Sequence, residues 1–374
     1  MPDLQPIELP DGGEEIPRSS FWMTLPQKRL FCQTIKNAKL PQGYASNIGR
    51  CVQVNEGKIT GYKSHDAHFC MHYLLPIALK VTLPKDVATP LIRLCRFFKG
   101  IWNKTINPCD LDNLHSKIVE TLCQLERIFP PTFFTVMVHL PVHLVEEIRL
   151  GGPVCSRCMY ANTPSKGVNH SNSQPFLPSV GKPTRRKGKA TKKSQYGFMI
   201  DHNTLAQAHT FVIFNCNSKD VERYIKVQWF KQKVALEEVV ISDHVKWLSQ
   251  GPSYVAKRYT GYFVNVYHFH TMKRDANSSC QNHGVTLTAL TPSFASSKDQ
   301  NPILGDVAYY GSIEDIIEIS YHGHFSVVLF KCVWFYSELD DDFTLVNKNK
   351  TICGGEPFIL ASQARQVFLC RRSN

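Results

Sequence analysis

The sequence has no run of about 20 apolar residues, the length that a helix needs to cross a bilayer. Its first twenty residues are acidic and proline-rich, and they lack the apolar core of a signal peptide. The thirteen cysteines are spaced too irregularly to indicate a disulfide framework. These absences favour an intracellular protein with no membrane partner and mostly reduced cysteines.

Acidic residues are outnumbered by basic ones. The 374 residues contain 31 Asp and Glu against 43 Lys and Arg, which gives a formal net charge of +12 and a pI near 9.0. This excess favours a polyanionic partner, of which nucleic acid is the first candidate. A hydrophobic fraction of 43% indicates folded domains, and the length allows two or three of them.

The first part of the chain shows the periodicity of amphipathic helices. The expected helices are one containing Leu30–Ile35 that ends at Pro41, one over 66–79 that Pro76 kinks, one over 86–98 with Asp86 as N-cap, one over 110–127 with Asp110 as N-cap, and a helix-turn-helix over 132–150. Together they predict a domain of four to five helices around one core.

From Lys257 onward the pattern becomes that of β-strands. Strands are expected over 259–271, 284–290, 306–320, 325–335, 343–346 and 366–370. Simple alternation along 259–271 would place Tyr259, Gly261, Phe263, Asn265, Tyr267 and Phe269 on one face. The predicted fold class is therefore α+β, with an N-terminal helical domain, a flexible basic linker and a C-terminal, mainly antiparallel β domain.

The expected linker is rich in Ser, Pro and Lys and poor in large apolar residues. We divide the chain into a disordered leader (1–20), a helical domain (21–160), the linker (161–195), a helical connecting segment (196–256) and a β-rich domain (257–374).

Several segments carry a family resemblance. GYKSHDAH, LCQLERIFPPTFFTVMVHLPVHLVEE and RLGGPV closely resemble the helical domain that follows the nuclease core in plant CACTA-type (En/Spm-like) transposases. GPSYVAKRYTGYFVNVYHFHT, YYGSIEDIIEISY and EPFILASQARQVF resemble a second domain, found in tandem with the first in plant transposon-derived proteins. Both are domains of unknown function, and together the resemblances cover roughly 22–160 and 196–374.

The resemblance implies an RNase H-type nuclease core, in which three acids hold two Mg²⁺ ions, upstream of the segment at Phe21. We therefore expect no catalysis by this chain alone. Candidates for a final acid are Asp66, Glu146 and Glu147, and the competing interpretation is that these are helix-start acids.

Histidine and cysteine are concentrated in an HxxHxCxH pattern formed by His65, His68, Cys70 and His72. On a helix the three histidines share a face, as zinc ligands would. The family pattern KSHDCH retains His65, Asp66 and His68, and we favour capping and core hydrogen bonding over metal. We expect no cofactor, with Zn or Mg as the alternative.

Cys155 and Cys158 form a CxxC motif with no second CxxC nearby, and we expect them to be incidental.

A basic run with seven cations and no acid occupies residues 182–193. Its members are Lys182, Arg185, Arg186, Lys187, Lys189, Lys192 and Lys193. This basic run fits contact with DNA phosphates, a nuclear import signal or a solvated linker.

In the β domain, aromatic and basic residues alternate in a way that fits either a stacking platform for nucleic acid or half-buried strands. They are Lys257, Arg258, Tyr259, Tyr262, Tyr267, His268, His270 and Lys273.

The function that these features favour is a non-catalytic remnant or accessory part of a CACTA-type transposon protein, associated with DNA in the nucleus. One alternative is a protein-interaction module that pairs with a transposase subunit or with itself. A second is a metal-dependent nuclease fragment.

Overall fold

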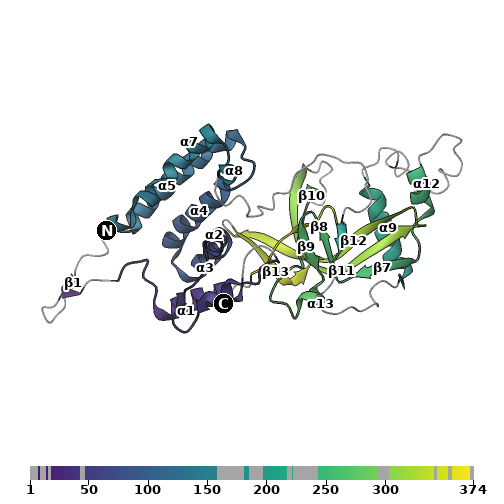
Figure 1. The fold of residues 1–374 in the computed structure, drawn as a ribbon, viewed down its shortest axis with the longest axis horizontal. Helices are drawn as coiled ribbons and strands as arrows, with labels where there is room; N and C mark the ends of the chain where they lie inside the picture. Colours follow the sequence, from purple (N-terminus) through teal and green to yellow (C-terminus); the bar gives the residue numbers. More distant parts are fainter. Residues whose placement is uncertain are drawn as a thin grey trace. The chain divides into compact units, whose positions relative to one another are not determined.

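A computed structural model describes residues 7–8, 14–15, 18–42, 47–157, 181–184, 197–216, 221, 243–293, 303–340, 343–352 and 356–370 (Figure 1). The chain divides into two compact units. Unit 1 comprises Met1–Ala38, Gly43–Gly167 and Cys370–Asn374, and unit 2 comprises Lys39–Gln42 and Val168–Leu369. Helices in the N-terminal half and an antiparallel sheet in the C-terminal half confirm the predicted α+β class.

Unit 1 is built mainly of helices. They are α1 (Leu25–Asn37), α2 (Ser64–Phe69), the π-helical η3 (Cys70–Leu74), α3 (Leu75–Thr82), α4 (Lys85–Ile101), α5 (Leu111–Ile128), α6 (Val136–His139), α7 (Pro141–Gly151) and α8 (Val154–Arg157). The described part also contains three short 3-10 turns, which are η2 (Ile48–Cys51), η4 (Pro108–Asp110) and η5 (Pro131–Phe133). Two pairs of two-residue strands complete it: β1 (Ile7–Glu8) pairs with β2 (Glu14–Glu15), and β3 (Val52–Gln53) pairs with β4 (Lys58–Ile59). No helix among these residues is both long and apolar enough to span a membrane.

The apolar stripes of α4, α5 and α7 form one core. Phe97 and Ile101 of α4 meet Ile118 of α5 and Val145 and Ile148 of α7, and all five are buried. Helical spacing of apolar residues produces this arrangement, because each stripe is hydrated unless it faces another. The periodicity identified these helices correctly.

The helix starts differ in part from the sequence expectation. Asp110 is the N-cap of α5 as predicted, although its side chain makes no capping hydrogen bond. Asp86 lies in the first turn of α4, whose N-cap is Pro84, so the prediction for Asp86 was wrong. A proline can occupy this position because the first N–H groups of a helix have no helical partner. The first helix begins at Leu25, where Thr24 and Gln27 form a capping box.

Unit 2 contains an eight-stranded antiparallel sheet. Its strands are β6 (Phe198–Met199), β7 (Val255–Tyr259), β10 (Gly284–Ser293), β11 (Ile303–Tyr321), β12 (Phe325–Asp340), β13 (Phe343–Thr351), β14 (Phe358–Leu360) and β15 (Arg365–Gln366). The main order is β13-β12-β11-β10-β15, while β14 pairs with β12, β7 with β11, and β6 with β7. Helices α9 (His202–Phe214) and α12 (Asp243–Gln250) share one core cluster with β11, β12 and β14 (Figure 1).

Residues 259–271 do not form the single strand that was expected. The chain reverses at Asn265 and Val266, both with positive φ (50° and 62°), and pairs β8 (Gly261–Val264) with β9 (Tyr267–His270). A β-branched residue such as Val266 rarely adopts positive φ, so local residue preferences do not predict this turn. The hairpin buries Tyr262 and Tyr267, which confirms the core interpretation of these two rings.

Part of the predicted linker is a strand. Gly181–Pro183 forms β5 and pairs with β8, giving the three-stranded sheet β5-β8-β9. A Cβ at Gly181 would lie 2.4 Å from the ring of Tyr262, so glycine permits this close approach. The composition of the expected linker did not predict the pairing of β5 with β8, because this pairing depends on a single glycine, Gly181. Residues 161–180 and 185–195 of the expected linker lie outside the described part.

Ile118 and Val119 offer a paired test of the helical core. Ile118 is 1% exposed within the α4–α5–α7 core, whereas Val119 is 38% exposed on the same helix. We expect Ile118→Ala to lower the free energy of unfolding by about 2–5 kcal/mol, because it leaves a cavity. Val119→Ala should change it by about 0.5 kcal/mol or less. Urea unfolding followed by helical circular dichroism measures both, and equal losses would contradict the assigned core face.

Candidate functional site

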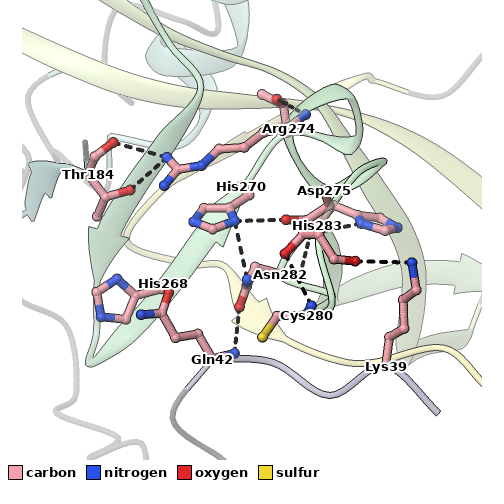
Figure 2. A network of polar contacts seen from close by, with 12 residues as sticks. Lys39, Gln42, Thr184, His268, His270, Arg274, Asp275, Cys280, Asn282 and His283 are labelled. Atoms are coloured by element: carbon pink, nitrogen blue, oxygen red, sulfur yellow. Dashed lines mark hydrogen bonds and ion pairs between the residues drawn. The ribbon is translucent and has the colours of Figure 1, made fainter. Parts of the chain in front are cut away.

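A buried carboxylate connects several segments of unit 2 (Figure 2). Asp275, 4% exposed, lies in the short helix α13 (Met272–Asp275) between the rings of His270 and His283. Its two oxygens face His270 Nδ1 at 2.7 Å and His283 Nδ1 at 3.0 Å. The backbone N–H of Asn282 donates to the same carboxylate. One side chain thus joins β9, α13 and the start of β10.

The protonation state of this network follows from its contacts. Burial alone would raise the pKa of Asp275, but hydrogen bonds from His270, His283 and the Asn282 N–H outweigh it and hold the pKa well below its usual range. An ionised Asp275 requires each facing Nδ1 to carry its proton. The Nε2 of His270 is also buried, and it has no hydrogen-bond partner within the described structure.

Residues Lys39–Gln42 belong to this network although they are remote in sequence. Gln42 N donates to Asn282 Oδ1 at 2.8 Å, and this contact orients the amide so that its Nδ2 faces His270 Nδ1 at 3.2 Å. The N–H of Gln281 donates to the carbonyl of Leu40, and Lys39 Nζ donates to the carbonyl of Ser278. This four-residue segment therefore completes the hydrogen bonding of the loop after α13.

Arg274 fastens the other side of the same region. Its guanidinium donates to both the carbonyl and the hydroxyl oxygen of Thr184 at 3.0 and 3.2 Å, as Figure 2 shows. A Cβ at Gly261 would lie 2.1 Å from this guanidinium, so only glycine leaves room for it. The contact fixes Thr184, the residue that follows β5. In the sequence, the other six cations of the basic run come directly after Thr184.

The arrangement is suited to fixing chain segments. The network holds an ionised acid between two imidazole rings, and within the described structure no hydroxyl or thiol of the kind that a nucleophile supplies is bonded to His270 Nε2. Sequence reasoning missed it because His270 was considered only for its place on a strand. The Asp275 and His283 spacing carries no recognised motif.

Most of the remaining residues of the predicted stacking platform form ion pairs or hydrogen bonds with acidic side chains. Lys257 Nζ lies 3.2 Å from Glu318, Arg258 Nε lies 2.7 Å from Asp315, and the Tyr259 hydroxyl donates to Glu318. Burial, followed by the hydrogen bond to Glu318, raises the pKa of Tyr259. His268 is half-buried beside Phe263, and Lys273 is exposed on α13. The platform is thus not an open row of aromatic and basic groups.

The HxxHxCxH residues span α2 and η3. His65 is exposed, whereas Asp66 is buried and accepts from the Lys63 N–H at 3.3 Å, as a helix-capping acid does. His68 and His72 lie against Trp102, with ring centroids 5.1 and 6.3 Å from it.

Burial also has the largest effect on the pKa values of His72 and Cys70. It lowers the pKa of His72 to about 4, with smaller contributions from His68 and Lys99, and it raises the pKa of the Cys70 thiol to about 11. Among the described residues no group of three or more His, Cys, Asp or Glu is arranged to hold a metal ion.

The other predicted residues are distributed as follows. Glu146 and Glu147 are exposed on α7, and Glu146 pairs with Arg149 at 3.0 Å, which also binds Asp112. Cys155 donates to the carbonyl of Asn103, while Cys158 lies outside the described residues.

Of the basic run, Lys182 lies on β5 with its Nζ 5.8 Å from the Phe263 ring centroid. Outside the described part are Arg185, Arg186, Lys187, Lys189, Lys192 and Lys193.

Sequence-based prediction did not identify one pair of histidines. His139 and His143 lie on the exposed surface of α6 and α7, with their Nε2 atoms 3.2 Å apart. Their four-residue spacing was the available signal.

Two parts of the chain match known family models. Residues 101–165 match a family described as Domain of unknown function (DUF4218), and residues 317–373 match one described as Domain of unknown function (DUF4216). The first match runs from the end of α4 past α8, and the second from β11 past β15. No curated protein and no solved structure matches the chain.

Asp275→Asn tests the buried network. We expect a loss of about 3 kcal/mol in the free energy of unfolding at neutral pH, because two imidazoles and one N–H lose an ionised acceptor. The depressed pKa of Asp275 stabilises the fold above the unfolded pKa of about 3.9, and this contribution is lost as the pH falls through the lower folded value.

The difference between the native chain and the variant should therefore be constant above pH 5 and shrink below about pH 4. Urea unfolding at a series of pH values measures it, with exposed Asp306→Asn as the matched control. A difference that grows on acidification would contradict the assigned ionisation.

Proposed function

We propose that the chain is a non-catalytic accessory part or remnant of a plant CACTA-type transposon protein, and that it associates with DNA through phosphate contacts. The observation that carries this proposal is the order of two separate domain matches, at 101–165 and 317–373, along a chain with a net charge of +12. The motif resemblance supplies the transposon link, and the excess charge favours a polyanion.

The ionisable groups support a non-catalytic role. Asp66 caps a helix and Glu146 is engaged by Arg149. A two-metal nuclease requires carboxylates gathered around its ions, and the described residues contain no such group. In this proposal the basic run supplies phosphate contacts and a nuclear import signal.

A protein-interaction module is the second candidate, because apolar side chains are exposed on the helical unit. Val136 and Met137 of α6 are 78% and 71% exposed, and Leu150 of α7 is 84% exposed. Contiguous exposed apolar patches mark interaction sites, and a partner that covered these side chains would remove them from water. The partner would be a transposase subunit or a second copy of this chain.

Salt dependence distinguishes the two candidates. We expect fluorescence anisotropy to show binding of the full chain to a labelled DNA duplex at low salt. Changing all seven cations of the basic run to Ser should lower the slope of log K against log salt by up to about 6, since each phosphate contact contributes about 0.9.

No binding at low salt would reject DNA association. Self-association that persists at high salt, measured by sedimentation, would instead favour the interaction module, because apolar contacts are not weakened by salt.

A further inference from the structure

The first part of unit 1 has an uneven distribution of charge. Between residues 18 and 63 the unit has seven basic residues and a single acid, Glu56. We call the seven the basic surface: Arg18, Lys28, Arg29, Lys36, Arg50, Lys58 and Lys63. All are exposed, and within the described structure none forms an ion pair. In contrast, Lys257 and Arg258 of unit 2 both pair with acids.

Packing against α1 brings these cations together. Arg29 Nε donates to the carbonyl of Asn55 in the β3–β4 turn at 3.1 Å. A Cβ at Gly57, whose φ is +64°, would lie 2.8 Å from the Cβ of Lys28, so the turn rests directly on the helix. Lys58 follows this turn.

The other end of α1 repeats the arrangement. A Cβ at Gly49 would lie 3.8 Å from Lys36 Cγ, and Arg50 is the next residue in η2. Residues up to 30 positions apart in sequence are thus presented around one helix. Like charges presented around one helix repel one another, and an anionic partner reduces that repulsion.

An exposed aromatic ring adjoins the surface. Trp22 is 54% exposed, and Lys28 Nζ and Arg18 Cζ lie 5.3 and 5.9 Å from its ring centroid. An indole ring is normally buried, since leaving it hydrated is unfavourable. Cations beside an exposed aromatic ring are the elements with which proteins bind single strands, where cations contact phosphates and the ring stacks on a base.

We propose that the basic surface binds the phosphates of a DNA strand and stacks Trp22 on one of its bases. This inference rests on the proposed DNA association and adds to it a contact in the helical unit, separate from the basic run. The partner is recognised by its backbone charge and an unpaired base, so binding is largely independent of sequence.

Two triple variants of the full chain test the location. Lys28→Gln, Lys36→Gln and Lys58→Gln remove three cations from the basic surface. Lys104→Gln, Lys117→Gln and Arg127→Gln remove three exposed cations elsewhere in unit 1 and cause the same change in net charge. With a labelled oligothymidine, the first variant should lower the salt slope by about 2, since each single-strand phosphate contributes about 0.7. The control should retain the native slope.

A second pair of variants tests stacking. Trp22→Leu should weaken oligothymidine binding about 5- to 100-fold, the usual range for one lost stacking ring. Tyr336→Leu is the control, because Tyr336 is also exposed (46%) beside a cation, Lys350, but lies in unit 2. Unchanged thermal unfolding verifies that each variant is folded.

The outcomes separate this inference from the proposed function. If the two triple variants lost oligothymidine binding equally, the assignment of DNA binding to the basic surface would be wrong. Native binding by the Lys28/Lys36/Lys58 variant would contradict it as well. If the basic-run variant alone lost binding, DNA association would stand and this inference would fail. If the native chain bound neither oligothymidine nor duplex at low salt, both would fall.

Discussion

The pairing of β11 with β12 is the interaction on which unit 2 depends. Every other strand of the large sheet is joined directly or through one neighbour to this pair, with β10 and β7 on β11 and β13 and β14 on β12. Residues of both strands are buried against α9 and α12, including Ile317, Ile319 and Leu329. Because these ladder hydrogen bonds are shielded from water by the helices, the sheet provides a stable base for the shorter β8–β9 hairpin.

Charged side chains have different partners in the two units. On unit 2, Lys257 and Arg258 bind acids across the strand pair β7–β11, and hydrogen bonds stabilise the charged form of Asp275. On unit 1, the cations around α1 form no ion pair with the residues that the structure describes, and Arg18 and Lys28 lie beside the exposed Trp22. A surface of this kind attracts anions over about a Debye length, whereas a paired cation does not.

The sequence identified what depends on periodicity and missed what depends on distant or unusual contacts. Apolar spacing predicted α5 and the long strand β11, whose observed bounds Leu111–Ile128 and Ile303–Tyr321 lie within about three residues of the expected ones. It could not predict the turn at Val266, because a β-branched residue with positive φ contradicts the local preference. Nor could it link Gln42 to Asn282, since these partners are 240 positions apart.

Shifted pKa values often mark catalytic groups, but their causes here indicate structural roles. Burial keeps His72 neutral and Cys70 a thiol, and these are the forms that an apolar helix packing favours. Asp275 is shifted in the opposite direction, yet its hydrogen bonds hold three segments of the chain. A catalytic acid or base must exchange its proton during the reaction, whereas each of these groups is held in one protonation state at neutral pH. Their chemistry therefore stabilises the two units from within.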